Sequence, residues 1–336
     1  MDSLTQITLG AAVGEAVLGK KAGNKALLWG AVAGTIPDLD VAVAAFMEPV
    51  QRLVFHRGLS HSILFAIVFA PLLGWIISKI HRDEGVGWKQ WAHLSFWGLF
   101  THMLLDSFTT YGTQLFYPFS NYPVAFNTIF VIDPLYTLPF LACVIATLFF
   151  SRTSPRRRFI NYLGIGLSTA YLGLTVVNKL HVDSVIEASL ERQQIRYDSF
   201  MTAPMPLNNI LWRAVVISGD RALSGYYSLL DSEKTVTFQA IDRNTGLIEP
   251  LRNDWEISEL MRVSKGYFAV MRDERGLVFN DLRFGQLGFE DSTGKNYVFA
   301  FNIQPNGSGV EVRRAPAEIR ISRELLRRLA ERALGN

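Results

Sequence analysis

The chain is 336 residues long, 49% of its residues are hydrophobic, and its formal net charge is only +3. A small charge spread over this length gives no reason to expect a nucleic-acid partner. Cys143 is the only cysteine, so a disulfide framework and a thiolate metal site are both excluded. Any metal site must therefore use histidine, carboxylate and other oxygen ligands.

The chain is predicted to have two unlike halves. Residues 1–178 hold long apolar runs, whereas residues 179–336 are mixed and charged like a soluble domain. The length is compatible with two domains. We therefore predict a membrane domain over residues 1–178 and an extracytoplasmic α+β domain over residues 179–336. The start does not resemble a cleavable signal peptide, because it opens with acidic Asp2 and no small-residue cleavage site follows.

The apolar half is predicted to form a bundle of about six transmembrane helices, since each span needs about 20 apolar residues. The segments are residues 4–18, 26–46, 59–80, 91–108, 131–150 and 159–177. The first is short for a full span, but its glycine and alanine residues suit close helix packing. The second is interrupted by Pro37, which lacks an amide hydrogen and clashes with the preceding turn.

Basic residues fall in alternate loops between these segments. They are Lys20, Lys21 and Lys25, then Lys79, Arg82 and Lys89, and finally Arg152, Arg156, Arg157 and Arg158. Because basic loops favour the cytoplasmic side, one topology satisfies all three loops. It predicts a multi-pass protein of a bacterial-type inner membrane, with the N-terminus and the second half outside the cytoplasm.

The second half is predicted to begin with an amphipathic helix over residues 179–200 that leaves the membrane. Alternating runs bounded by turn residues then predict strands, at residues 211–218, 225–230, 235–241 and 297–303. Short helices are expected at residues 254–261 and 322–334, the latter with Ser322 as its N-cap. These elements predict an α+β domain built on a β-sheet.

Residue types that bind metals stand in three motifs of the apolar half. The motifs are Pro37-Asp38-Leu39-Asp40, His56-Arg57-Gly58-Leu59-Ser60-His61 and His102-Met103-Leu104-Leu105-Asp106. Ionisable groups in or beside spanning segments are costly, so a functional site is the default interpretation. His102 and Asp106 are four apart and share one face of a helix. For this pair, the alternative is a hydrogen bond that ties helices together.

The first two motifs differ in their local structure. Asp38 and Asp40 stand where Pro37 breaks the predicted helix. Such breaks are tolerated where they line a cavity or are buried in protein, so the two acids are better explained as ligands than as caps. His56 and His61 are five apart and fall on different faces of a regular helix. His56 is therefore expected in the loop, and His61 in the first helical turn.

Arg57 offers a fork of donors that suits an anionic substrate such as a phosphate. The alternative is that its side chain snorkels to lipid headgroups. We predict that Asp40 and Arg57 act in catalysis. The predicted metal ligands are Asp38, His56, His61, His102 and Asp106. Interfacial, capping or other non-catalytic roles are expected for His81, His93, His181 and Asp133.

The order of these motifs resembles the YdjM-like family of membrane-bound, metal-dependent hydrolases. The matching residues are Met1-Asp2-Ser3-Leu4-Thr5 and residues 37–40, 56–62 and 101–112. The resemblance implies hydrolysis that depends on a bound metal. Many members have His where this chain has Gln6, which implies fewer ions here or an amide oxygen ligand. The ligand order is also similar to that of zinc-dependent phospholipase C and the P1-type nucleases, which cleave phosphate esters.

These observations predict a membrane-embedded hydrolase that acts on a phosphoester or ester of a lipid at the outer face of the membrane. A divalent metal would activate water and polarise the scissile group. Zinc fits histidine and aspartate ligation best, with manganese or iron as alternatives. Membrane lipids are the expected partners. Two non-enzymatic alternatives stay open: a structural metal beside a partner-binding outer domain, and an ion- or proton-coupled transporter.

Overall fold

A computed structural model describes the chain except for residues 83–84, 274–275, 287–296, 307–308, 316–322 and 336. The chain forms two compact units. The helical unit comprises Met1–Phe46, Phe55–Val176 and Pro206–Asn208. The sheet unit comprises Met47–Val54, Val177–Met205 and Asn209–Asn336. One helix, α8 (Pro155–Arg192), contributes its first part to the helical unit and its last part to the sheet unit.

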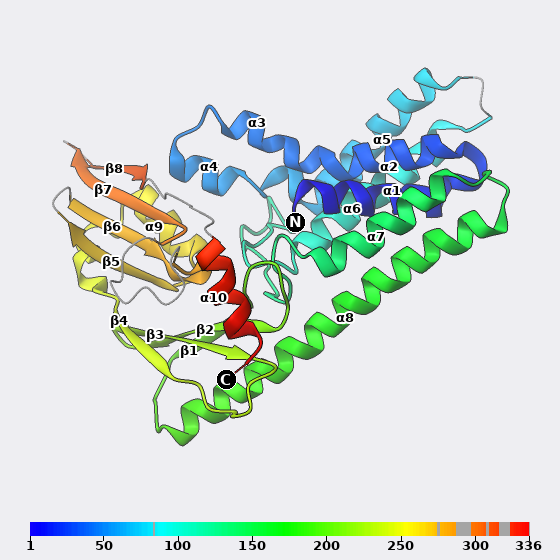
Figure 1. Ribbon diagram of the computed structural model, residues 1–336. Coiled ribbons are helices and arrows are strands. Elements are labelled where there is room, and N and C mark those ends of the chain that lie inside the picture. The colour runs from blue at the N-terminus through cyan, green and yellow to red at the C-terminus, as the bar shows by residue number, and fades with distance from the viewer. Residues whose placement is uncertain (83–84, 274–275, 287–296, 307–308, 316–322, 336) are drawn as a thin grey trace. The chain divides into compact units, whose positions relative to one another are not determined.

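The helical unit is a bundle whose helices run alongside one another (Figure 1). Besides the start of α8, its helices are α1 (Ser3–Ala22), α2 (Asn24–Thr35), α3 (Asp40–Ala44), α5 (Ile63–Ile80), α6 (Trp88–Asp106) and α7 (Pro134–Leu148), with the 3-10 turns η1 (Ile36–Leu39) and η2 (Leu59–His61). Helices α1 and α2 pack closely through glycines. A Cβ on Gly10 would lie 2.3 Å from the carbonyl oxygen of Gly30, which is why only small residues fit there.

Three helical segments in the described part of the chain are long and apolar enough to cross a membrane. They are Asn24–Ala44, which runs from α2 through α3, then α5 and α8; α7 is apolar but shorter. The prediction of six spans is therefore not supported. Helices α1 and α6 are 20 and 19 residues long, but polar side chains such as Gln6, Glu15 and His102 lower their hydropathy. These side chains are buried in the bundle, so they need not face lipid.

The sheet unit contains two antiparallel sheets, each with its strands in chain order. The first has β1 (Ser199–Pro204), β2 (Leu211–Ser218), β3 (Arg221–Ser228) and β4 (Phe238–Asp242), and the second has β5 (Phe268–Asp273), β6 (Gly276–Asp281), β7 (Ala300–Asn306) and β8 (Gly309–Arg314). Buried residues of both sheets, including Val215 and Ala269, share one hydrophobic cluster. A second cluster packs the end of α8 against the first sheet through Val182 and Trp212.

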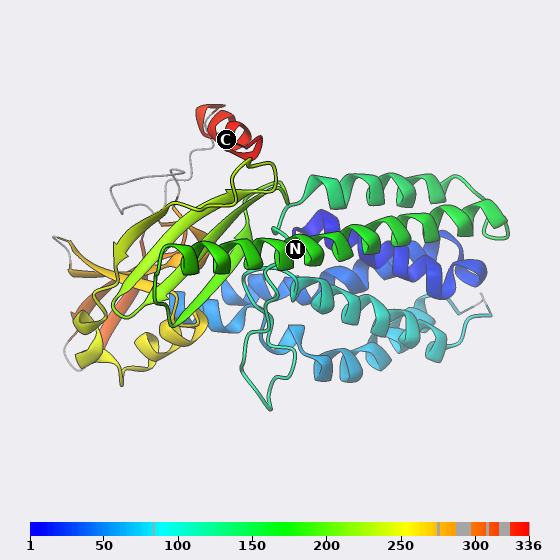
Figure 2. The ribbon, with the colours of Figure 1, turned by 90° about the horizontal axis from the view of Figure 1, so that it is seen from below.

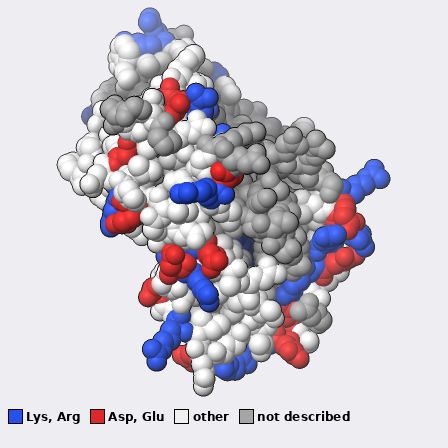
Figure 3. Space-filling model, turned by 90° about the vertical axis from the view of Figure 1, so that its left-hand side faces the viewer, with Lys and Arg blue, Asp and Glu red and all other residues white. Residues whose placement is uncertain are grey.

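Three helices complete this unit. Helix α9 (Trp255–Val263) and α4 (Pro49–Phe55) pack on the second sheet through Ile257 and Val50. Helix α10 (Arg323–Ala333) is held by an ion pair between Arg332 and Asp231, 2.6 Å apart. Charged side chains of both signs are interspersed over the face seen in Figure 3, as on an ordinary water-facing surface.

The predicted elements of the second half are partly confirmed. Strand β2 has the predicted bounds, β3, β4 and β7 overlap the predicted strands, and α9 and α10 overlap the predicted helices. Strands β1, β5, β6 and β8 and helix α4 were not predicted. The predicted helix over residues 179–200 is confirmed as far as Arg192, where it is the last part of α8; its predicted end is wrong, because β1 begins at Ser199. The predicted cap Ser322 lies outside the described residues.

Candidate metal centre

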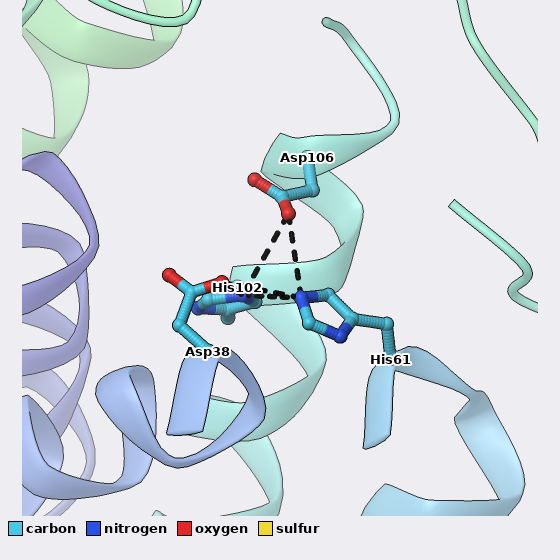
Figure 4. A group of neighbouring side chains, drawn as sticks. All are labelled: Asp38, His61, His102 and Asp106. Carbon is cyan, nitrogen blue, oxygen red and sulfur yellow. Dashed lines mark hydrogen bonds and ion pairs between the residues drawn. The ribbon is translucent and has the colours of Figure 1, made fainter. Parts of the chain in front are cut away.

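Four side chains of the three sequence motifs converge inside the helical unit (Figure 4). Asp38, His61, His102 and Asp106 each offer one ligand atom, and these atoms lie within 4.8 Å of one another. Three of the residues are fully buried, and the Asp38 side chain is 20% exposed. This Asp/His cluster can therefore hold a metal ion.

Local chain geometry explains how the four residues meet. Helix α2 ends at Thr35, and Pro37 lies in the 3-10 turn η1 that follows. This turn carries Asp38. His61 lies in the 3-10 turn η2, just before α5, and not within the helix itself as predicted. Ser62 caps α5 by accepting a hydrogen bond from the amide of Phe65 at 3.1 Å.

The outer nitrogens of both imidazoles are held by acceptors. His102 Nδ1 lies 2.6 Å from the carbonyl oxygen of Gly34, which can only accept, so this nitrogen carries the proton. The hydroxyl of Ser60 donates to Asp40 at 2.8 Å, so it accepts from His61 Nδ1, 3.0 Å away. Neutral imidazoles in these tautomers direct the lone pair of Nε2 into the cluster. An outer partner of this kind is the usual companion of a metal-bound histidine.

Five of the six separations among the four inward-facing atoms are close to those of a tetrahedral ligand set, and the Asp38 and Asp106 oxygens lie within 4.8 Å of each other. The two Nε2 atoms of His61 and His102 are 3.1 Å apart. Asp38 Oδ1 lies 3.4 and 3.6 Å from them, and Asp106 Oδ2 lies 3.5 and 3.7 Å from them. Zinc bonds of about 2.0–2.2 Å separate tetrahedral N and O ligands by about 3.3–3.6 Å. The residues therefore fit a small divalent cation.

One buried atom of the cluster is not satisfied by the protein. Asp106 Oδ2 finds no hydrogen-bond partner among the described residues. Arg57 Nε forms an ion pair with it at 3.2 Å, but the geometry does not make a hydrogen bond, and that nitrogen likewise has no hydrogen-bond partner within the described chain. An unsatisfied buried carboxylate oxygen costs free energy, and a cation at the centre of the cluster would satisfy it.

The other oxygen of Asp106 is held by the start of the chain. Gln6 Nε2 donates to Asp106 Oδ1 at 2.8 Å and to the carbonyl oxygen of His102 at 3.3 Å. The amino nitrogen of Met1 also contacts Asp106 Oδ1. Gln6 thus presents its amide donor to a cluster residue; the two predicted consequences of Gln6 at this position, fewer ions or an amide oxygen ligand, stay predictions. The contacts of Met1, and the roles of Ser60 and the Gly34 carbonyl, were not predicted.

Arg57 lies against the cluster and is only 5% exposed. Its Nη1 donates to Thr109 at 2.9 Å, and its guanidinium lies 4.9 Å from the centroid of the Tyr111 ring. Together with the contact to Asp106, these interactions fix the side chain beside the cluster. They place a positive charge beside the cluster. The side chain is buried, so it does not extend to lipid headgroups as the alternative expected. The predicted catalytic role of Arg57 stays a prediction.

Asp40 and His56 form a pair at the edge of the cluster. Asp40 Oδ1 lies 2.8 Å from His56 Nδ1, while Oδ2 accepts from the amide of Arg57 at 3.1 Å and from Ser60. His56 is outside the group of four, and its side chain is 22% exposed. Asp40 thus orients two histidines, His56 directly and His61 through Ser60. Metal ligation by His56 and catalysis by Asp40 stay predictions.

The four residues for which non-catalytic roles were predicted lie outside the Asp/His cluster. His81 accepts from the indole of Trp29 at 2.9 Å, and His93 accepts from that of Trp97 at 2.8 Å. The remaining two are Asp133, which caps α7, and His181, which belongs to the sheet unit.

Fold and site together define a membrane protein with apolar spanning helices and a buried cluster of metal-ligand type. The chain belongs to the family described as YdjM inner membrane protein, whose profile matches residues 1–182. This stretch contains every residue of the Asp/His cluster.

One relative spans nearly the whole chain. The chain is 24% identical over 312 residues to the uncharacterized protein YfhP of Bacillus subtilis (strain 168), a match that covers 86% of this chain and 88% of that protein. No solved structure matches. The family resemblance inferred from the motifs is thus confirmed, and neither match names an activity.

Proposed function

We propose that this protein is a membrane-embedded, metal-dependent hydrolase that cleaves a phosphoester or ester bond of a lipid. One observation carries the proposal: two oriented imidazoles and two carboxylates direct lone pairs at one buried point, with the spacing of a tetrahedral metal site. Lone pairs held this close repel one another unless a cation or protons lie between them.

We assign Asp38, His61, His102 and Asp106 as the metal ligands, and zinc as the best fit to their donor atoms. When bound, such an ion lowers the pKa of water and polarises a scissile bond. The residues around it act by position. Asp40 orients His56 and Ser60, and Gln6 holds Asp106. Arg57 supplies positive charge beside the cluster, where an anionic headgroup would benefit from it.

We propose that the cluster faces the outer side of the membrane and that the sheet unit is extracytoplasmic. Basic loops support this orientation. At the end of α1 that is remote from Gln6, Arg152 donates to the carbonyl oxygen of Lys21 at 2.8 Å. Arg157 is bonded to Asn24 there. Basic residues near span ends favour the cytoplasm, so the other ends of these helices, where the cluster lies, belong outside.

A structural metal is the competing function, and a specific observation favours it. The four protein atoms would fill a tetrahedral site, whereas catalytic zinc usually keeps a position for water. The two functions differ in whether Asp38 stays bound to the metal. Asp38 is the partly exposed member of the four, so it is the ligand that water could replace.

The test is a phospholipid-hydrolysis screen on purified, metal-loaded protein in lipid, with Arg57→Ala and Asp40→Asn as variants. The proposal expects hydrolysis by the wild type and impaired hydrolysis in both variants, with unchanged metal content in Arg57→Ala. No hydrolysis by the wild type over phospholipid and ester substrates, with the metal retained, would favour the structural metal.

A further inference from the structure

The connection between α6 and α7 is an uncharged, aromatic segment. Residues 107–132 contain no Asp, Glu, Lys or Arg. Its exposed aromatic side chains are Phe116 (54%), Tyr117 (37%), Phe119 (87%), Tyr122 (59%) and Phe126 (47%). Figure 2 shows the connection extending sideways from the ends of α6 and α7, across the direction of those helices. Exposed apolar groups gathered in this way mark an interaction surface.

This aromatic loop is tied to the segments that build the Asp/His cluster. The amide of Gln114 donates to the carbonyl oxygen of Arg57 at 3.0 Å, and the amide of Ile63 donates to that of Leu115 at 2.9 Å. Leu115, Ile36 and Ile63 pack against the same hydrophobic cluster. Ile36 is the first residue of η1, and Ile63 follows η2 closely. The loop therefore borders both turns that carry cluster residues.

The cluster reaches the surface on one side, and that side has an apolar rim. The side chains of Asp38 and His56 are 20% and 22% exposed, whereas His61 is fully buried. The turns η1 and η2 that carry Asp38 and His61 each also contain an exposed apolar residue, Leu39 at 58% and Leu59 at 50%. A substrate dissolved in water would more often meet a polar rim, and apolar side chains here suit acyl chains.

We propose that residues 113–132 lie in the interfacial layer of the bilayer and, with Leu39 and Leu59, form a lateral entrance through which a phospholipid headgroup reaches Asp38. Aromatic side chains are enriched at this depth because their rings suit the boundary between headgroups and acyl chains. The opposite end of α7 differs, since its connection to α8 carries Arg152, and Arg156 follows in the first turn of α8. The position of this loop in the bilayer does not depend on the proposed function. Only cleavage of the headgroup at the cluster rests on that function.

Single nitroxide labels test this placement in liposomes of phosphatidylethanolamine and phosphatidylglycerol. Cys143→Ala removes the single native cysteine. Phe119→Cys and Tyr122→Cys then report on the loop, and Leu59→Cys reports on the rim. Thr153→Cys, in the basic connection, is the matched control. We expect oxygen, which partitions into lipid, to relax the loop and rim labels several-fold more than a water-soluble nickel chelate does, with the reverse order at Thr153.

Two results would overturn the entrance. One is a nickel-accessible loop, which means water, and the other is a loop closed to both reagents, which means a covering protein. Repeating the measurement in His102→Ala separates this claim from catalysis, because immersion of the loop does not require the metal. A lipid-immersed loop without hydrolysis would sink the proposed function alone, and a water-exposed loop with hydrolysis would sink the entrance alone.

Discussion

Two groups of buried charges lie in the helical unit, and they are built differently. In the first, Arg157 donates to both carboxylate oxygens of Glu15 at 2.7 Å, and its third nitrogen donates to Asn24 and to the carbonyl oxygen of Phe150 at 2.8 Å. Both side chains are 2% exposed. In this bidentate pair each nitrogen of the guanidinium and both carboxylate oxygens make hydrogen bonds, so no atom of the pair is left without a partner.

The Asp/His cluster is equally buried but incompletely satisfied. Asp106 Oδ2 and Arg57 Nε lack hydrogen-bond partners within the described residues, and the Nε2 atoms of His61 and His102 face each other. Both groups consist of largely buried ionisable side chains, and the completeness of their hydrogen bonding separates them. A fully hydrogen-bonded network ties helices together, whereas a set of converging lone pairs requires a cation or protons at its centre.

Breaking the closed pair should give the largest loss of stability. Glu15→Ala leaves Arg157 buried without its carboxylate, which typically costs about 3–5 kcal/mol. We expect a markedly lower apparent Tm in detergent, with unchanged metal content in the folded fraction. Removing both charges, in Glu15→Gln with Arg157→Gln, should recover part of the loss. A Glu15→Ala variant as stable as the wild type would contradict the contrast between the two groups.

A substitution in the Asp/His cluster, unlike Glu15→Ala, should change stability mainly when metal is present. In chelator-treated protein, Asp38→Asn should change the free energy of unfolding by less than about 1 kcal/mol, or stabilise the protein, because it relieves repulsion between carboxylates. Added zinc at 100 times its Kd should stabilise the wild type by about 2.7 kcal/mol and the variant much less. Thermal unfolding with and without zinc measures both effects. Equal stabilisation of the two proteins would show that the ion binds elsewhere.

How much of this could be predicted depends on whether a feature is local. The spacing of His102 and Asp106, the helix break at Pro37 and the histidine motif at residues 56–61 are local signals. They predicted all four members of the cluster, together with His56, which lies outside the group of four. The partners from Gln6 and the Gly34 carbonyl are tertiary contacts, which no spacing in the sequence specifies. Their roles emerge only where distant segments meet.

The fold, like the site, was predicted where the signal is local and missed where tertiary contacts define the structure. Strand β2 was predicted with its bounds because its apolar run ends at a clear turn. The six predicted spans are not supported, because polar residues lower the hydropathy of α1 and α6 and because α7 is short. Strands β5 and β6 were missed although they are paired along their length, since tertiary pairing defines them more than alternation does.

The smallest effects should come from the residues that orient the ligands. Ser60→Ala removes the hydroxyl between Asp40 and His61, and Gln6→Ala removes the amide on Asp106. Loss of such partners typically weakens metal affinity about 10–100-fold. Competition with a chromogenic zinc chelator measures this change. Ser78→Ala, at an exposed helix position, is the matched control and should bind as tightly as the wild type. Unchanged affinity in both test variants would mean that the outer contacts do not shape the site.

The most direct test of the account is the metal content of the purified protein. Elemental analysis should find about one equivalent of zinc or a similar divalent ion per chain, the number that one tetrahedral site holds. His102→Ala and Asp106→Ala should each lose most of it, while His93→Ala and Arg157→Gln retain it in the folded fraction. Full retention of metal by both cluster variants, or no bound metal in wild-type protein prepared without chelators, would contradict the claim that this cluster is a metal centre.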